Sequence, residues 1–185
     1  LKNLAKHHKV IVKSNTLPSI ELKTYCKENN LSLMLPDDES KGFGANNNEV
    51  FNYAISQLRM QDNDFFLVLN PDVIITEESI EQLLLLATQF QSDISAINLY
   101  KNRERTLSDD SIRRYHSLLN PLKGLLGLKR NDAYDKSKIE KPITIDWAAG
   151  SFLLFTVKSY KKLKGFDEKY FMYFEDVDIC TRANK

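Results

Sequence analysis

The sequence predicts an α/β fold in which a mostly parallel sheet is flanked by helices. Apolar runs alternate with amphipathic segments in the order strand, helix, strand, helix, strand, helix, strand, insertion, strand, helix. One run, Phe65–Leu69, holds five apolar residues without alternation, which is typical of a strand buried on both faces of a parallel sheet. At 185 residues the chain is long enough for one domain, residues 1–185, and hardly for two.

The composition is that of an ordinary globular protein, with 42% hydrophobic and 28% charged residues. The net charge of +1 gives no reason to expect a nucleic-acid partner. No apolar run reaches the roughly 18 residues of a membrane span. Cys26 and Cys180 lie far apart without CxxC spacing, so we expect two reduced, buried cysteines. The three histidines show no ligand spacing, which argues against a zinc site.

The N-terminal part of the chain predicts a strand, a helix and a second strand. Residues 9–13 form a β-branched run that ends at Ser14-Asn15. Residues 20–29 predict a helix stopped by an Asn-Asn pair, and residues 32–35 predict a strand closed by Pro36.

A run rich in Gly and Asn, residues 42–48, precedes a helix with one apolar stripe. The stripe is formed by Val50, Phe51, Ala54, Ile55 and Leu58. Glycines allow backbone to approach a ligand closely, and a helix N-terminus presents N–H groups to an anion such as phosphate. The alternative is a Gly/Asn turn with a helix cap, which needs no ligand.

The third strand ends abruptly at Asn70-Pro71-Asp72. A helix is expected over residues 77–90, with Thr76 as its cap. In α/β sheets, ligands bind beyond the carboxyl ends of strands, which is where Asp72 lies. Asn-Pro-Asp is also a good turn on its own chemistry.

Residues 95–100 predict another strand, and a basic insertion follows at residues 101–141. It holds 11 Lys and Arg against 6 Asp and Glu, a net charge of +5. Leucines are scattered through its later part without a clear period, namely Leu118, Leu119, Leu122, Leu125, Leu126 and Leu128. Such a segment is consistent with an interfacial membrane element or a lid over an acceptor. It is equally consistent with a solvated insertion that packs a few leucines on the domain.

Strand character resumes over residues 143–150 and 152–157. Trp147 is most simply a core residue. Because Asp146 and Gly150 lie beside it near the expected strand turn, its aromatic face is alternatively a wall of a sugar site.

The stretch 171–180 joins a block of aromatic residues to the carboxylates Glu175, Asp176 and Asp178. The acids are expected to open a short helix, residues 175–182, where unpaired N–H groups and the helix dipole favour negative charge. Alternatively, one carboxylate is lifted out of bulk water by the aromatic residues and serves as a general base.

Five motifs in a fixed order connect these observations. They are residues 42–48 (GFGANNN), Asn70-Pro71-Asp72, Asp146-Trp147-x-x-Gly150, residues 165–168 (GFDE) and residues 171–178 (FMYFEDVD). Together they resemble family 2 glycosyltransferases, and most of all the rhamnosyltransferase-like branch that builds bacterial O-antigen and capsular polysaccharides. The match covers about residues 10–182.

The resemblance implies a GT-A fold, a nucleotide-diphosphate sugar donor (a dTDP- or UDP-sugar, with dTDP-rhamnose one candidate), Mg²⁺ or Mn²⁺, and inversion at the anomeric carbon. Asp72 takes the place of the metal-binding carboxylate of the family's Asp-x-Asp motif, with Asn70 at the first acid. Asp176 falls on the position of the family's catalytic base. The resemblance assigns donor binding to Asn15, Gly44, Asn48, Asn70 and Asp72, and acceptor binding to Asp146, Trp147, Gly150 and Glu175.

These roles agree with the chemistry of sugar transfer. A diphosphate leaves readily only when its growing charge is neutralised, and Mg²⁺ or Mn²⁺ bridging Asp72 and the phosphates would supply that neutralisation. Asp176 would accept the proton of the attacking hydroxyl, and such a base is worth about 10²–10⁴ in rate. A single displacement of this kind inverts the configuration.

Two departures from the family pattern keep other functions open. The family opens with a strand ending in Thr-Tyr-Asn or similar, which is missing, so we expect a fragment without that first strand. Its second strand usually ends in Asp-Asn, with the Asp recognising the pyrimidine, whereas this chain has Ser14-Asn15. A non-catalytic domain that binds a sugar or a partner is therefore the alternative hypothesis. A nucleotidyltransferase would want a Gly-rich basic loop after the first strand, and residues 15–18 offer none.

The expected location is the cytoplasm. The basic insertion is predicted to hold the protein against the inner face of the cytoplasmic membrane, where a lipid-linked acceptor would lie. A free saccharide is the alternative acceptor.

Overall fold

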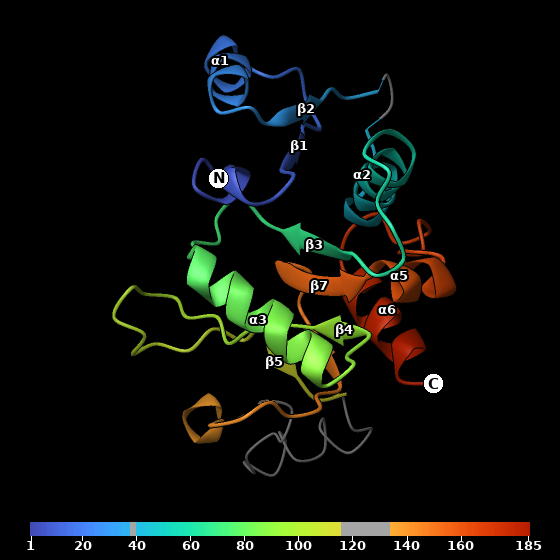
Figure 1. The fold of residues 1–185 in the computed structure, drawn as a ribbon. Coiled ribbons are helices and arrows are strands. Elements are labelled where there is room, and N and C mark those ends of the chain that lie inside the picture. Colours follow the sequence, from blue (N-terminus) through green and yellow to red (C-terminus); the bar gives the residue numbers. More distant parts are fainter. Residues whose placement is uncertain (38–39, 116–133) are drawn as a thin grey trace, which may run out of the picture.

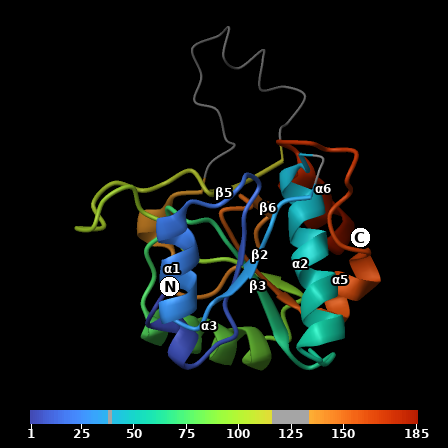
Figure 2. The same ribbon diagram turned by 90° about the horizontal axis from the view of Figure 1, so that it is seen from above.

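The computed structural model of the protein describes residues 1–37, 40–115 and 134–185, and it is an α/β structure (Figure 1). Its elements are η1 (Leu4–Lys6), β1 (Ile11–Lys13), α1 (Ile20–Glu28), β2 (Ser32–Met34), α2 (Phe43–Gln57), β3 (Phe65–Leu69), α3 (Glu77–Gln89), β4 (Ile94–Ser95), β5 (Ile112–Arg113), η2 (Lys136–Lys138), β6 (Trp147–Ala148), β7 (Phe152–Thr156), α5 (Val157–Leu163) and α6 (Glu175–Ala183). α3 covers one face of the central strands, and α2, α5 and α6 cover the other (Figure 1, Figure 2).

Three strands form the central sheet, in the order β3-β7-β4. β7 pairs antiparallel with both neighbours, with Phe65 opposite Thr156 on one side and Ile94 opposite Phe155 on the other. β3 and β4 therefore run parallel to one another, as expected for two strands joined by the crossover helix α3. β1 and β2 form a separate parallel pair, and β5 and β6 form an antiparallel one.

The predicted α/β class is confirmed, but the direction of β7 departs from the expectation of a mostly parallel sheet. β7 follows β6 after a turn of residues 149–151, and it fills the space between β3 and β4 in the opposite direction. A short apolar strand buried on both faces has the same residue pattern whichever way it runs, so the pattern could not give this direction.

Burial of β3 on both faces is confirmed. Phe66 and Val68 face the larger core cluster, while Phe65, Leu67 and Leu69 face α3. The larger cluster is centred on Tyr160 of α5, whose ring centroid lies 4.3 Å from that of Phe51 and 5.1 Å from that of Phe66. Each aromatic pair of this kind adds about 0.5–1.5 kcal/mol to the stabilisation from buried area.

Helix α2 begins earlier than the sequence suggested, because the run rich in Gly and Asn is itself helical. Gly42 is the N-cap, and the side-chain amides of Asn46 and Asn47 donate back to the carbonyls of Gly42 and Phe43. The two glycines lie where the chain packs against itself. A Cβ on Gly42 would collide with the carbonyl oxygen of Phe171, so this close approach involves the protein's own backbone.

Other boundaries also differ from the predictions. The strands expected at residues 95–100 and 143–150 are reduced to β4 and β6, because few of their residues find a neighbouring strand to pair with. Helix α5 was missed, although it begins at a Thr156 cap and ends at Lys164, which is in the left-handed conformation. The leucines expected to characterise the insertion, Leu118 to Leu128, lie outside the described residues.

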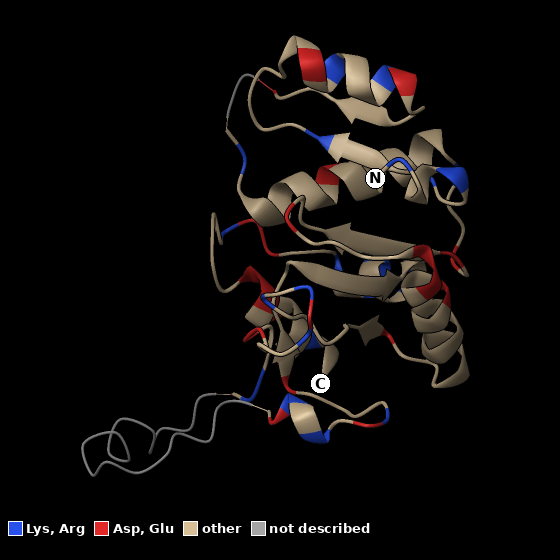
Figure 3. Cartoon of the chain, turned by 90° about the vertical axis from the view of Figure 1, so that its left-hand side faces the viewer, with Lys and Arg blue, Asp and Glu red and all other residues tan. Residues whose placement is uncertain are grey.

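Charged residues lie mainly on helices and connections, and the central strands β3 and β7 carry none (Figure 3). Cys26 and Cys180 are both buried and unbridged, as expected, and burial raises the pKa of the Cys180 thiol to about 11. In the part of the chain that the structure describes, every helix is too short or too polar to cross a lipid bilayer.

Candidate functional site

The candidate site is built around the start of α6. The predicted acid-rich helix is confirmed, and Glu175, Asp176 and Asp178 all lie in its first turn. Tyr173 and Phe174 precede it with φ of 71° and 70°, a left-handed conformation that is unusual for aromatic residues. The side chains of residues 171–174 are all exposed. Two consecutive left-handed residues cost free energy, and they persist only where contacts with the surrounding structure hold them. Backbone strain of this kind is common at functional sites.

The carboxylate of Asp176 is held by two backbone donors. Its Oδ1 accepts from the N–H of Val177 at 2.8 Å, and its Oδ2 accepts from the N–H of Gly150 at 3.1 Å. The structure therefore brings together two predicted site residues that are 26 positions apart. The side chain is half-buried, which leaves part of the carboxylate free to meet a ligand.

Glu175 differs sharply from its neighbour because it is buried. Desolvation by burial raises the pKa of the Glu175 carboxyl above its usual value, and the nearby charge of Asp176 adds to this effect. Its Oε2 has no hydrogen-bond partner among the described residues. A buried carboxyl oxygen without a partner is costly, so Glu175 does not stabilise the fold through this oxygen.

Asn70 and Asp72 reach the same region from the end of β3. The N–H of Asn70 donates to the carbonyl of Ser151 at 2.9 Å, and Ser151 is the residue after Gly150. The two adjacent residues Gly150 and Ser151 thus connect the Asn70-Pro71-Asp72 turn to Asp176. Asp72 is exposed beyond the carboxyl end of β3, where α/β proteins bind ligands.

Asn15 lies at the carboxyl end of β1, next to the start of α2. Its Nδ2 donates to the carbonyl of Lys41 at 3.2 Å, and Asn46 donates to the same carbonyl at 2.9 Å. The ammonium of Lys41 binds the carboxylates of Asp37 and Glu49, and these hydrogen bonds raise its pKa well above the usual range.

Gly44 and Asn48, the other residues predicted on the donor side, pack within the protein. Gly44 is buried, and a Cβ there would lie 2.7 Å from the Cβ of Phe166. The Asn48 amide has four partners within the chain: its Oδ1 accepts from Tyr160 and from the N–H of Phe166, and its Nδ2 donates to the Phe166 carbonyl and to Glu168. Donor contact by either residue stays a prediction.

Asp146 and Trp147, which were predicted on the acceptor side, lie near the other end of α6. One carboxylate oxygen of Asp146 accepts from the N–H of Tyr115 at 2.7 Å, and its carbonyl accepts from Asn184. The indole N–H of Trp147 donates to the carbonyl of Arg114, and its half-buried ring packs against the larger core cluster. The structure therefore shows a core contact for Trp147 and leaves part of its ring exposed, so the acceptor role stays a prediction.

Comparison with known proteins gives the family. No family model matches the chain. The chain is 32% identical over 180 residues to Rhamnosyltransferase WbbL of Escherichia coli, an alignment that covers 97% of this chain and 67% of that protein. The chain belongs to the rhamnosyltransferase family.

Two further relatives, which are both named as sugar transferases, agree with this assignment. An N-acetylglucosaminyl-diphospho-decaprenol L-rhamnosyltransferase of Mycobacterium tuberculosis is 30% identical over 167 residues, which cover 82% of this chain and 53% of that protein. A low-salt glycan biosynthesis hexosyltransferase of Haloferax volcanii is 25% identical over 167 residues, which cover 90% of this chain and 50% of that protein. The chain thus spans about two thirds of the first relative and about half of these two.

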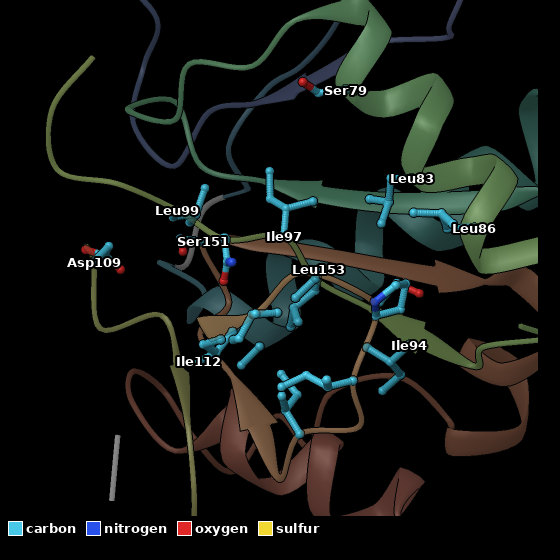
Figure 4. A pocket seen from close by; sticks show the side chains of 18 of the residues that line it. Ser79, Leu83, Leu86, Ile94, Ile97, Leu99, Asp109, Ile112, Ser151 and Leu153 are labelled. Atoms are coloured by element: carbon cyan, nitrogen blue, oxygen red, sulfur yellow. The ribbon is translucent and has the colours of Figure 1, made fainter. Parts of the chain in front are cut away.

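In this rhamnosyltransferase-family chain, a broad pocket of about 1440 Å³ is lined mainly by residues of α3, of β4 and of the segments 96–105 and 139–148. Asp72, Asp146, Trp147 and Ser151 line part of it. Figure 4 shows the side chains of Leu83, Leu86, Ile94, Ile97, Leu99, Ile112 and Leu153 around its apolar part. The pocket thus joins Asp72, predicted on the donor side, to Asp146 and Trp147, predicted on the acceptor side, whereas Asp176 is not among the described residues that line it.

The surroundings of Asp72 meet the modest needs of a divalent metal that also binds phosphates. In residues 1–37, 40–115 and 134–185, no three His, Cys, Asp or Glu side chains gather as metal ligands. Mg²⁺ at phosphate sites needs only one or two carboxylates, because waters and substrate phosphates complete its shell. Asp72 supplies hard oxygen ligands where it lines the pocket, and the side-chain oxygen of Asn70, two residues earlier in the chain, is a further group of this kind, so the residues present fit such a metal.

Sequence reasoning missed two residues that organise this site. Ser151 receives the N–H of Asn70, and Phe43 contacts Gly150 from the first turn of α2. A signal for Phe43 was present, because a large aromatic residue between two glycines at a helix start indicates close packing on both sides. Ser151 acts through its backbone, which leaves no signal in the residue type.

Proposed function

We propose that the protein is an inverting glycosyltransferase that moves a sugar, with rhamnose the favoured candidate, from a dTDP- or UDP-sugar to an acceptor hydroxyl in cell-surface polysaccharide synthesis. The observation that carries this proposal is the link from Asp176 through Gly150 and Ser151 to Asn70, beside Asp72. It gives one carboxylate for the acceptor and a second for the donor, on two segments that backbone hydrogen bonds of residues 150 and 151 connect.

In this mechanism, Asp176 accepts the proton of the acceptor hydroxyl while the hydroxyl oxygen attacks the anomeric carbon from the face opposite the diphosphate. The Gly150 and Val177 N–H groups hold the carboxylate in one orientation during this step. The bond to the diphosphate breaks as the new glycosidic bond forms, which inverts the configuration.

Asp72 and Asn70 are proposed to hold Mg²⁺ or Mn²⁺ against the donor diphosphate. A metal ion there would neutralise charge on the leaving group. Asn15, at the end of β1, is proposed to contact the nucleotide, and Glu175, Asp146 and Trp147 to contact the acceptor saccharide. Burial keeps Glu175 protonated to a higher pH than an ordinary carboxyl, so it is able to donate a hydrogen bond to a sugar oxygen.

The acceptor is proposed to be lipid-linked. The name of the Mycobacterium tuberculosis relative gives a saccharide on diphospho-decaprenol as its acceptor. A chain acting on such a molecule would work in the cytoplasm, at the inner membrane face. The net charge of +5 over residues 101–141 supports contact with anionic lipid there.

Metal-dependent donor binding tests the donor half of this proposal. We expect dTDP-rhamnose or a UDP-sugar with Mn²⁺ to raise the melting temperature by several degrees. Asp72→Ala should abolish the part of the shift that depends on Mn²⁺. Glu81→Ala, which removes an exposed carboxylate of α3, is the matched control and should keep it. An unchanged Mn²⁺-dependent shift in Asp72→Ala would remove Asp72 from this role.

A further inference from the structure

Phe43, the first residue of α2, lies at a junction of the candidate site. Its N–H donates to the carbonyl of Phe171 at 3.1 Å. Its ring packs edge-on against Phe166, with ring centroids 5.8 Å apart and an interplanar angle of 74°. The start of α2 therefore holds the segment that leads into α6 at two points, by its backbone and by a side chain.

The same ring contacts the residue that orients Asp176. A Cβ built on Gly150 would lie 2.9 Å from Cε1 and 3.0 Å from Cζ of Phe43, so ring and backbone are in direct contact. The Cβ of Asp176 would lie 3.8 Å from the same point. The buried residue Gly150 thus has the Phe43 ring and the Asp176 side chain packed around it, with its N–H on the Asp176 carboxylate.

Phe43 is also unlike the purely structural aromatic residues of the core. Phe51, on the same helix, is buried in the larger cluster, whereas Phe43 is only half-buried at the edge of that cluster. Its contacts are with Gly150, Phe166 and the Phe171 backbone, all in segments that flank Asp176 in the fold.

We propose that Phe43 is a positioning residue, whose ring presses the Gly150 peptide against Asp176 and so fixes the carboxylate in the orientation that accepts the acceptor proton. The catalytic relevance of this contact rests on the proposed function, while the contact itself does not. A substitution at Phe43 should therefore lower turnover with little effect on donor binding.

Amide hydrogen exchange at Gly150 tests the contact without any substrate. We expect Phe43→Leu to speed exchange of the Gly150 N–H at least 10-fold. Asp176→Ala should have the same effect, because it removes the acceptor of the Gly150 hydrogen bond. The control Phe51→Leu enlarges a core space on the same helix and should change Gly150 exchange no more than that of neighbouring amides. Exchange at Gly150 that is equal in Phe43→Leu and the unsubstituted protein would overturn the proposal.

A pair of complementary substitutions tests the catalytic part. Gly150→Ala should lower kcat because its Cβ meets the Phe43 ring, and the double variant Phe43→Leu with Gly150→Ala should regain turnover because the shorter side chain leaves space for the methyl group. We expect about a 10-fold loss of kcat in each single variant with dTDP-rhamnose and an N-acetylglucosaminyl-diphospho-lipid acceptor, since misplacement of about 1 Å can cost 10²-fold. The donor KM should stay unchanged.

The outcomes separate this proposal from the proposed function. Wild-type kcat in both single variants, or a double variant no better than the product of the two, would overturn the positioning role. Transfer that persists in Asp176→Asn would overturn the proposed function instead, and the exchange result at Gly150 would still decide whether Phe43 holds that peptide.

Discussion

Replacing Asn48 by Ala should destabilise the protein strongly, although the side chain lies on a helix surface and touches no proposed reacting group. The Asn48 amide joins α2 to α5 and to the turn that precedes α6 through four hydrogen bonds. Its Oδ1 accepts from the hydroxyl of Tyr160 at 2.7 Å and from the N–H of Phe166 at 3.0 Å.

The magnitude follows from the groups that Asn48→Ala leaves without a partner. Tyr160 and Phe166 are each 2% exposed, so water does not readily replace the lost acceptor. Each of the two buried donors left unsatisfied costs about 1–3 kcal/mol, which predicts a loss of roughly 2–6 kcal/mol of unfolding free energy. For a chain of this size that corresponds to a fall in Tm of roughly 4–24 °C.

Urea unfolding of a double-mutant cycle with Tyr160→Phe is the assay. Tyr160→Phe removes one donor but leaves Phe166 to pair with Asn48, so it should cost only about 0.5–1.5 kcal/mol. Asn48→Ala should cost about 1 kcal/mol less in the Tyr160→Phe background, because the unsatisfied hydroxyl is then absent. A loss below about 0.5 kcal/mol for Asn48→Ala, or strict additivity in the cycle, would refute the reasoning.

Two further predictions concern the same packing and the buried carboxyl. Gly42→Ala should lower the urea midpoint because the new Cβ collides with the Phe171 carbonyl. The control Ala45→Gly, on the same turn, should cost only the ~1 kcal/mol of a glycine in a helix. An unchanged midpoint in Gly42→Ala would contradict the packing at this position. Burial raises the pKa of Glu175 in the folded protein, so ionisation of this carboxyl favours the unfolded chain. The resulting loss of unfolding free energy grows as the pH rises from the pKa in the unfolded chain to the pKa in the folded protein. Glu175→Gln should therefore raise the unfolding free energy at pH 8 relative to the unsubstituted chain and change it little at pH 3.5. A stabilisation that is equal at both pH values would show that the charge of Glu175 is not its cause.

Much of the fold was predictable because local signals and burial agreed. The caps Thr76 and the Asn29-Asn30 pair gave the ends of their helices, and the unbroken apolar run of β3 gave a strand covered on both faces. These features depend on neighbours in the chain or on burial alone, which the residue pattern reports directly.

Other features depend on contacts between distant segments, which no local pattern reports. The helical conformation of residues 43–48 depends on contacts with the distant residues Phe166 and Phe171. Gly42 and Gly44 pack directly against these residues, which makes glycine favourable at this helix start. The direction of β7 depends on its pairing with β3 and β4, which lie far from it in the sequence.

The candidate site shows the same division. Asp176, Gly150 and Asn70 were found from motifs, and the structure links them through backbone groups of residues 150 and 151. Phe43 was found only from the structure, because its role is a contact with a glycine that is 107 residues away in the sequence. Side-chain chemistry is visible in a sequence, whereas the backbone donors that orient it are not.

The most direct test of the central claim separates donor binding from transfer in Asp176→Asn. This variant keeps the shape of the side chain and one oxygen, which can accept from either Gly150 or Val177, but it removes the carboxylate that takes the proton. The mechanism predicts that dTDP-rhamnose with Mn²⁺ binds as it does to the unsubstituted protein, while transfer to the lipid-linked acceptor falls by about 10²–10⁴. Turnover within a few-fold of the unsubstituted protein would contradict the assignment of Asp176 as the base.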